Sequence, residues 1–126
     1  MISCGGGGIP VIRQGNHLKG ASAVIDKDFA SALLAKELDA DVLIILTAIE
    51  KAAIHFGTPE QTWLDDITVA EAKQYIAEGH FAPGSMLPKI EAGISFIEKG
   101  EGRAAVITDM AHAKEGYEEK AGTIIR

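Results

Sequence analysis

The stretch DKDFASALLAKELDADVLIIL, residues 26–46, decides the fold because two different hydrophobic periodicities follow one another in it. Apolar residues recur at helical spacing from Phe29 to Leu38, and Asp26 stands where a helix N-cap is expected. An unbroken apolar run of strand length follows at Val42–Leu46. Such a run is typical of a central parallel strand that is covered on both faces. We therefore predict an amphipathic helix of about three turns followed by a buried strand.

The same alternation of helix and strand continues toward the carboxyl terminus. Thr68 and Glu71 have the spacing of a capping box, which predicts a helix over 69–78. Pro88 suits the first position of another helix, because its missing amide donor costs nothing there. Two further strands are expected at 104–107 and 123–125. The pattern predicts an α/β fold: an open, mainly parallel sheet with helices on both faces. Such sheets bind ligands beyond the carboxyl ends of their strands.

Four consecutive glycines, Gly5, Gly6, Gly7 and Gly8, follow a short apolar segment that is expected to be a strand ending at Cys4. Successive glycine amides can form a concave nest for phosphate oxygens, whereas a plain flexible turn needs no ligand. Composition alone leaves both interpretations open. After the glycines we expect a hairpin with its tip at 14–16 and its returning arm at 21–25.

Two lysines stand at predicted helix starts, where exposed amides favour anions over cations. Lys27 lies between Asp26 and Asp28, and Lys89 follows the loop residues Gly84, Ser85 and Met86. Each lysine fits a phosphate ligand or a simple solvated charge equally well. If both lysines bind phosphate, a carboxylate such as Asp28 is suited to hold the two ammonium groups in place.

The bulk properties exclude several classes of protein. With 126 residues and 47% apolar composition, the chain is expected to form one domain. A net charge of -6 argues against binding to nucleic acid or to an anionic membrane. The single cysteine and the lack of a bilayer-length apolar segment favour a cytoplasmic protein. The four histidines have no zinc-ligand spacing, so no metal ligands are predicted.

Several separate segments together resemble the carbamate kinases, which belong to the amino acid kinase family. They are GGGGIPV at 5–11, AVIDKD at 23–28, LT at 46–47, HFG at 55–57, GSMLPK at 84–89 and GTI at 122–124. These segments occur in the order and at the spacing of that family, across the whole chain. The resemblance implies the nucleotide-binding carboxyl-terminal lobe of a two-lobed α/β enzyme, spanning residues 1–126.

The resemblance also implies a reaction and a site. Carbamate kinases transfer a phosphoryl group reversibly between ATP and carbamate, mostly forming ATP from carbamoyl phosphate and ADP with Mg²⁺, in fermentative arginine or purine breakdown. By position, Lys27 and Lys89 correspond to lysines that contact the phosphates, and Asp28 to the carboxylate that organises them. The glycine run would line the phosphate channel, and Asp26, Gly84 and Ser85 are also expected to bind the nucleotide. The adenine pocket is expected to be lined by Ile49, Ala52, Ala53 and Met86.

One departure from the family is large, because the amino-terminal lobe with its own glycine-rich loops and phosphate-binding lysine has no counterpart here. A truncated product, an excised domain and one piece of a split enzyme all fit this sequence. The expected partners are nucleotide, carbamate or carbamoyl phosphate, and either a second copy of the chain or the absent lobe. Two alternatives to a competent kinase stay open: an inactive remnant lobe that associates with itself, and another amino acid kinase acting on glutamate, aspartate or a nucleotide.

Overall fold

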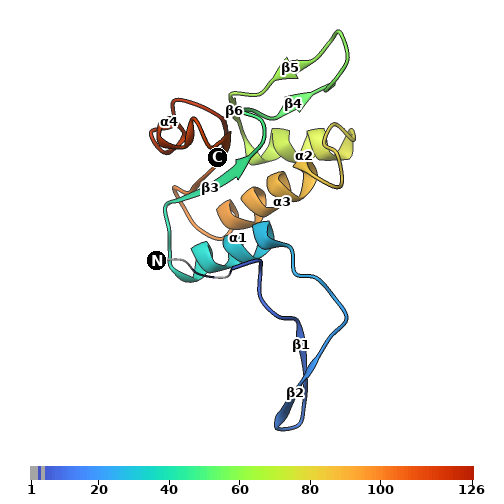
Figure 1. Cartoon of the computed structure of the whole chain (residues 1–126). Helices are drawn as coiled ribbons and strands as arrows, with labels where there is room; N and C mark the ends of the chain where they lie inside the picture. The colour runs from blue at the N-terminus through green and yellow to red at the C-terminus, as the bar shows by residue number, and fades with distance from the viewer. Residues whose placement is uncertain (1–2, 4) are drawn as a thin grey trace.

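Helices cover both faces of a four-stranded sheet in the computed structural model, which describes residue 3 and residues 5–126 (Figure 1). The expected strand before the glycine run falls on residues 1–4, of which 1, 2 and 4 lie outside the described part. The sheet strands are β3 (Val42–Thr47), β6 (Asp66–Ile67), β7 (Ala104–Asp109) and β8 (Thr123–Ile125).

The sheet has the strand order β3-β7-β8-β6 and is mainly parallel. β3 and β7 are parallel, with Val42 opposite Ala104, and β6 and β8 are parallel, whereas β7 and β8 are antiparallel. The predicted α/β sheet is confirmed. The prediction that 42–46 is a central strand is wrong for the described residues, where β3 lies at an edge and β7 inside. An apolar run reports burial of its side chains and carries no information on strand order.

Alternate side chains of β7 point to two different helix layers. Ala105 faces α3 (Met86–Ile97), where a Cβ added to Gly93 would lie 3.0 Å from the Ala105 Cβ. Val106 and Thr108 face the other way, toward the short helix α4 (Ala113–Tyr117), whose Gly116 would meet the Thr108 methyl group at 3.0 Å. Both helices therefore approach the sheet through a glycine. The helix α4 was not predicted from the sequence.

The other two helices begin at the caps that the sequence indicated. α1 (Lys27–Glu37) has Asp26 as its N-cap, and the Asp26 carboxylate accepts a hydrogen bond from the Asp28 amide at 2.7 Å. α2 (Val69–Ala77) begins with the predicted capping box between Thr68 and Glu71. α3 begins at Met86, so Pro88 is its third residue and its predicted place at the first position is wrong. The proline still lies in the first turn, where no amide donor is needed.

The inner side of α1 differs from the simple amphipathic pattern. Asp28 and Ala32 are its buried residues, while Phe29 and Leu33 are 41% and 55% exposed. The small alanine side chain lets α1 lie against α3, where the Lys36 ammonium donates to the Ser95 hydroxyl at 3.2 Å. The larger apolar residues of α1 face away from the core of this chain.

Two hairpins extend from the body at opposite ends (Figure 1). β1 (Val11–Gln14) and β2 (His17–Gly20) form the amino-terminal hairpin, and all eight residues are exposed. Its tip is at the predicted position, but the returning arm is 17–20 rather than 21–25, because a two-residue turn pairs Gln14 directly with His17. β4 (Ala53–Ile54) and β5 (Thr62–Trp63) form the second hairpin. No helix in the described part of the chain has the length and apolar character needed to cross a bilayer.

Candidate functional site

The starts of α1 and α3 lie side by side beyond the carboxyl end of the parallel strands. A short connection leads from α1 into β3 and another from α3 into β7. Each helix runs antiparallel to the strand that follows it, so both helices begin at the edge of the sheet where β3 and β7 end. The Lys89 ammonium, at the start of α3, donates a hydrogen bond to the Asp28 carboxylate, at the start of α1, at 2.8 Å. The fold thus joins two residues that are 61 positions apart in the sequence.

Asp28 forms ion pairs with both predicted catalytic lysines. Its Oδ2 lies 2.8 Å from the Lys89 Nζ, and its Oδ1 lies 3.7 Å from the Lys27 Nζ. The Asp28 and Lys89 side chains are 8% and 11% exposed, whereas that of Lys27 is 64% exposed. A buried lysine needs a partner of opposite charge, and Asp28 supplies it. Lys89 is therefore held in one position, whereas the mostly exposed Lys27 side chain can also meet an anion from solvent.

The glycine run passes close to the residues that lead into α1. Gly7 has φ of 112°, and a Cβ there would lie 2.8 Å from the Ile25 carbonyl oxygen. Glycine is therefore required at this position for both backbone conformation and space. Gly5 and Gly8 also have positive φ, but an added Cβ would meet no atom of the described structure within 4 Å. One of the four glycines is thus explained by packing, and the other three leave the backbone accessible.

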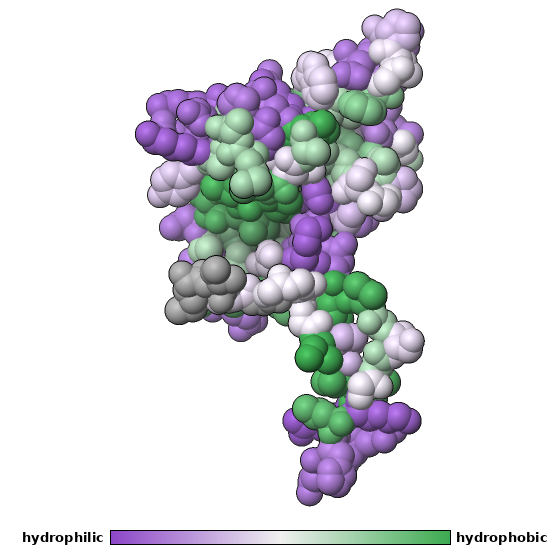
Figure 2. Space-filling model, viewed as in Figure 1, coloured by the Kyte–Doolittle hydropathy of each residue, from purple (hydrophilic) through white to green (hydrophobic). Residues whose placement is uncertain are grey.

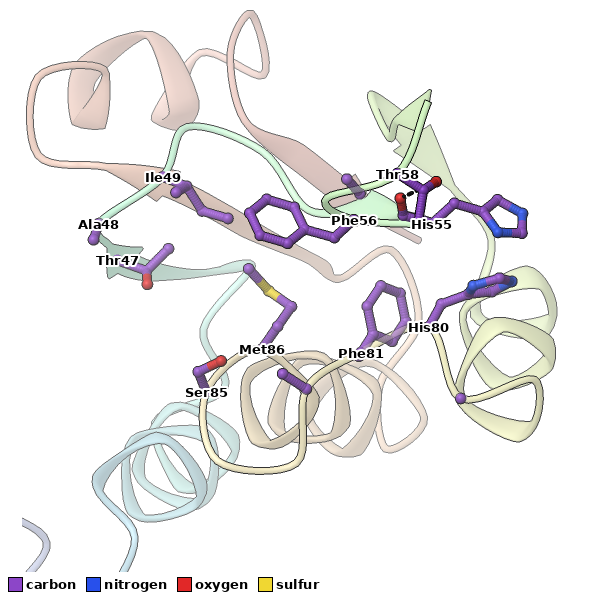
Figure 3. Close-up of a pocket in the computed structure, with 13 residues that line it drawn as sticks. Thr47, Ala48, Ile49, His55, Phe56, Thr58, His80, Phe81, Ser85 and Met86 are labelled. Atoms are coloured by element: carbon purple, nitrogen blue, oxygen red, sulfur yellow. Dashed lines mark hydrogen bonds between the residues drawn. The ribbon is translucent and has the colours of Figure 1, made fainter. Parts of the chain in front are cut away.

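A cavity of about 560 Å³ opens next to the start of α3 (Figure 3). This volume lies in the range of pockets that hold small ligands. The lining comes from the end of β3, the β4 hairpin and the loop that leads into α3. Most of the lining side chains are apolar, and they are Ala48, Ile49, Ala53, Phe56, Phe81, Ala82 and Met86. The remaining lining residues are Thr47, His55, Thr58, Gly79, His80 and Ser85.

Four of the residues expected to bind nucleotide line this cavity: Ile49, Ala53, Ser85 and Met86. Ala52 is placed elsewhere, because it is fully buried and its amide donates a hydrogen bond to the Thr123 hydroxyl at 2.8 Å. Gly84 lies in the exposed loop just before Ser85 and does not contribute to the described lining. The lysines and the glycine run lie outside the lining, on the side where the helices begin.

The aromatic residues of the cavity were missed by the sequence reasoning. His55 and His80 contact each other edge-to-face with their ring centroids 4.4 Å apart, and Phe56 and Phe81 also line the cavity. The histidines lack the spacing of metal ligands, so the sequence does not mark them as site residues. The available signal was that each histidine directly precedes a phenylalanine, in HFG at 55–57 and HF at 80–81. Only the fold brings those two dipeptides together.

A second missed feature lies at the end of β7, opposite Thr47 on β3. The Asp109 carboxylate accepts hydrogen bonds from the His112 backbone amide at 2.9 Å and from the His112 Nδ1 at 2.8 Å. These bonds, led by the one from the backbone amide, lower the pKa of Asp109. The hydrogen bond to Asp109 in turn raises the pKa of His112. Because an N–H at Nδ1 is held by the carboxylate, the Nε2 atom of His112 is left for another partner.

The described residues, 3 and 5–126, contain no group of three or more histidine, cysteine, aspartate or glutamate side chains placed to hold a metal ion. The two oxygens of the Asp28 carboxylate, at the predicted phosphate site, already lie beside Lys27 and Lys89. Mg²⁺ in nucleotide sites is commonly bound through substrate phosphates and only one or two carboxylates. The side chains at this site therefore do not form a metal cage of their own.

Comparisons with known proteins show the family of the chain. The model of the amino acid kinase family matches residues 4–109. The chain belongs to the amino acid kinase family. It is 62% identical over 125 residues to carbamate kinase-like protein YqeA of Escherichia coli (strain K12). It is 53% identical over 125 residues to carbamate kinase 2 of Staphylococcus aureus (strain Mu50 / ATCC 700699). Each alignment covers 99% of this chain.

The structure also matches a solved member of the family. Carbamate kinase from Giardia lamblia bound to AMP-PNP superposes with a TM-score of 0.90 and 42% sequence identity over 95% of this chain. This likeness confirms the predicted carbamate kinase-like fold. The chain spans 40% of the length of the two bacterial relatives and 38% of the Giardia chain. It therefore corresponds to less than half of each of these proteins.

Proposed function

We propose that this chain is the nucleotide-binding lobe of a carbamate kinase, which transfers a phosphoryl group reversibly between ATP and carbamate. The observation that carries the proposal is the Asp28 carboxylate between Lys27 and Lys89, at the start of a helix pair in which Ser85 and Met86, at the start of α3, line the apolar cavity. The cavity would take the adenine base, and the lysines at the helix starts would meet the phosphates. The nucleotide analogue bound by the Giardia carbamate kinase supports this assignment of the ligand class.

In the direction of ATP formation, the bond between phosphorus and the carbamate oxygen of carbamoyl phosphate breaks. A bond forms between that phosphorus and a terminal oxygen of the ADP β-phosphate, and carbamate leaves. Catalysis of such a transfer depends on positioning and on neutralising the charge of the migrating group. Lys89 is positioned by Asp28, and the exposed Lys27 can move toward the phosphates. The backbone amides of Gly5, Gly6 and Gly8 would line the path of the phosphates.

Magnesium enters this proposal with the nucleotide. When bound, Mg²⁺ would offset the negative charge of the nucleotide phosphates. This chain would contribute the two lysines and the helix amides around that complex. The acceptor site and its carbamate would belong to the amino-terminal lobe, which is consistent with the share of the relatives that this chain spans.

A coupled assay tests the activity. The chain is mixed with a separately produced amino-terminal lobe of a carbamate kinase, and ATP formation from carbamoyl phosphate and ADP is followed with hexokinase and a dehydrogenase. We expect ATP formation that depends on both pieces and falls at least about 100-fold in Lys27→Ala, since each charge-assisted contact contributes strongly in phosphoryl transfer. A control is Lys99→Ala, an exposed lysine beyond the end of α3. Equal rates for the two variants would contradict the proposal.

A second candidate, a remnant lobe that associates with itself, is favoured by the exposed apolar surface. Figure 2 shows hydrophobic side chains uncovered over β3 and along the amino-terminal hairpin. On β3, Leu46 is 43% exposed, and in the hairpin Ile12 and Leu18 are 58% and 66% exposed. Exposed apolar surface of this kind commonly marks an interface. It would be covered by a second copy in a remnant and by the amino-terminal lobe in a complete kinase.

Sedimentation velocity separates these two candidates. A remnant predicts a concentration-dependent dimer that the double variant Ile12→Asp, Leu18→Asp converts to monomer, together with weak nucleotide binding or none. The kinase proposal predicts that an added amino-terminal lobe binds to the chain and displaces any self-association. A dimer that persists in the presence of the added lobe would favour the remnant.

A further inference from the structure

Two separate segments form opposite walls of the cavity, and each wall carries a histidine followed by a phenylalanine (Figure 3). His55 and Phe56 belong to the turn that joins β4 to β5, whereas His80 and Phe81 belong to the loop that leads into α3. Figure 3 shows the two imidazole rings beside each other at one end of the cavity, turned away from the other lining side chains. The histidines therefore join the two walls rather than facing the space between them.

The contact between His55 and His80 has a defined geometry. The two rings meet edge-to-face with their centroids 4.4 Å apart. The backbone of His55 has φ of 51°, an uncommon conformation for a residue other than glycine. Thr58 holds this conformation, because its amide and hydroxyl both donate to the His55 carbonyl, at 3.1 Å and 2.8 Å. The turn thus presents the His55 ring to His80.

The wall that carries His55 is held mainly at its base. The strands β4 and β5 have two residues each, and residues 55–60 of the turn between them are all exposed. At the base, Ala52 accepts a backbone hydrogen bond from Leu64 at 2.9 Å and donates one to the Thr123 hydroxyl at 2.8 Å. A hairpin of two short strands is only marginally stable without further packing. The contact at its tip, through His55, is therefore important for its position.

One carboxylate is placed to balance charge on the histidine pair. The His80 Nε2 atom lies 3.1 Å from the Glu78 carboxylate. The hydrogen bond from Gln74 is the leading cause that lowers the pKa of Glu78, and His80 and His55 act in the same direction. Glu78 therefore carries one negative charge, which offsets a single protonated imidazole.

The other titratable groups near the pair add no second negative charge at the rings. Tyr75, on α2, packs its neutral phenol ring against His80 at 5.9 Å. Glu60, in the exposed turn, accepts a hydrogen bond from the Thr58 hydroxyl at 3.4 Å. When both imidazole rings are protonated, one of their two positive charges is left without a partner among these groups.

We propose that the His55–His80 contact is a latch that holds the β4–β5 hairpin against the loop before α3, and that acid opens this latch by charging both rings. Imidazole groups gain their charge as pH falls between about 8 and 5. Two unit charges about 4 Å apart in water repel each other enough to shift an equilibrium about fivefold. Opening would move Phe56 away from Phe81. The two histidines are thus positioning residues that set the width of the cavity without touching what it binds.

Trp63 reports the position of the hairpin, because it is the single tryptophan of the chain and meets the Phe56 ring edge-to-face at 6.3 Å. Its fluorescence is quenched with acrylamide between pH 8 and pH 5, without ligand, while circular dichroism confirms the fold at each pH. We expect the quenching constant to rise as pH falls. The rise should shrink in about 1 M salt, which screens the repulsion.

Two substitutions remove the latch charge by charge. His55→Asn takes away one imidazole and keeps a residue that tolerates positive φ, so the rise in quenching should disappear. His80→Asn should have the same effect. His17→Asn, in the exposed β1–β2 hairpin, is the matched control and should keep the full pH response. His112→Asn is a second control, which removes the ring bonded to Asp109 and should also keep the response.

Each outcome has a definite meaning. A quenching constant that does not change with pH in the unmodified chain would overturn the latch, and so would an undiminished rise in both His55→Asn and His80→Asn. Because the titration uses no nucleotide, either result leaves the proposed function standing. If His80→Asn fails to fold by circular dichroism, His55→Asn alone decides.

Discussion

The starts of α2 and α3 differ in whether side chains cap the free backbone amides of the first helical turn. At the start of α2, the Thr68 hydroxyl accepts from the Glu71 amide at 3.2 Å, and the Glu71 carboxylate accepts from the Thr68 amide at 2.8 Å. At the start of α3, Ser85 makes no side-chain capping bond to any described residue, and Lys89 brings a positive charge where the macrodipole disfavours one. The comparison indicates that a helix start closed by its own side chains is structural, and one left open beside a cavity is available to a ligand.

The largest expected effect on stability comes from removing the positive charge of Lys89 at the start of α3. Lys89→Ala leaves the buried Asp28 carboxylate without its 2.8 Å partner, and we expect unfolding free energy to fall by about 3 kcal/mol. Urea denaturation followed by circular dichroism measures the change. Lys27→Ala, at an exposed side chain, should change stability by less than about 0.5 kcal/mol. Equal losses of unfolding free energy in Lys89→Ala and Lys27→Ala would mean that the Asp28 carboxylate does not depend on Lys89 more than on Lys27.

Removing the side-chain cap at the start of α2 should have a smaller effect on stability. Thr68→Ala removes the hydroxyl that caps α2, and we expect a loss of about 1 kcal/mol in the free energy of unfolding. The same denaturation experiment measures it. Nucleotide affinity should be unchanged, because Thr68 does not line the cavity in the described structure. A large loss of affinity would show that α2 contributes to the site.

The corresponding change at the open start should hardly affect stability. Ser85→Ala removes a hydroxyl that caps no amide in the described structure, so we expect less than about 0.5 kcal/mol. Its effect should appear in binding, where Mg-ADP affinity is expected to weaken several-fold because Ser85 lines the cavity. A stability loss as large as that of Thr68→Ala would remove the distinction between the two helix starts.

The two starts should also differ in their response to acid. Bonds from the Thr68 amide and hydroxyl lower the pKa of Glu71, so its contribution is present above the unfolded-state pKa. That contribution is lost as pH falls through the folded-state pKa. We expect the melting temperature difference between the unmodified chain and Glu71→Gln to shrink as pH falls below 4.5, the usual pKa of the group. A difference that stays constant down to pH 3 would contradict this role of the carboxylate.

Local signals in the sequence were sufficient for the closed helix start and insufficient for the open one. The capping box is a four-residue pattern whose partners are all local, so α2 was predicted to within one residue. The start of α3 was placed two residues late, because Ser85 has no local bond that marks the boundary. The edge position of β3 and the existence of α4 depend on long-range packing, which periodicity does not report.

The candidate site likewise combines features that could be predicted from the sequence with features that could not. Lys27, Asp28 and Lys89 were predicted from the resemblance, and the fold brings them together. Whether these residues catalyse a transfer stays a prediction. The contrast between a buried Lys89 and an exposed Lys27 was not predictable, because it depends on how α1 packs against α3. The His55–His80 contact was missed for the same reason, since 25 residues separate the two rings in the sequence.

Titration of the folded chain with Mg-ADP in a calorimeter tests the central claim most directly, because it requires neither the acceptor nor the second lobe. We expect saturable binding at or below millimolar nucleotide, weakened about tenfold or more by Lys27→Ala without a change in thermal stability. A folded sample that gives no binding heat at millimolar nucleotide would contradict the claim that this chain is a nucleotide-binding lobe.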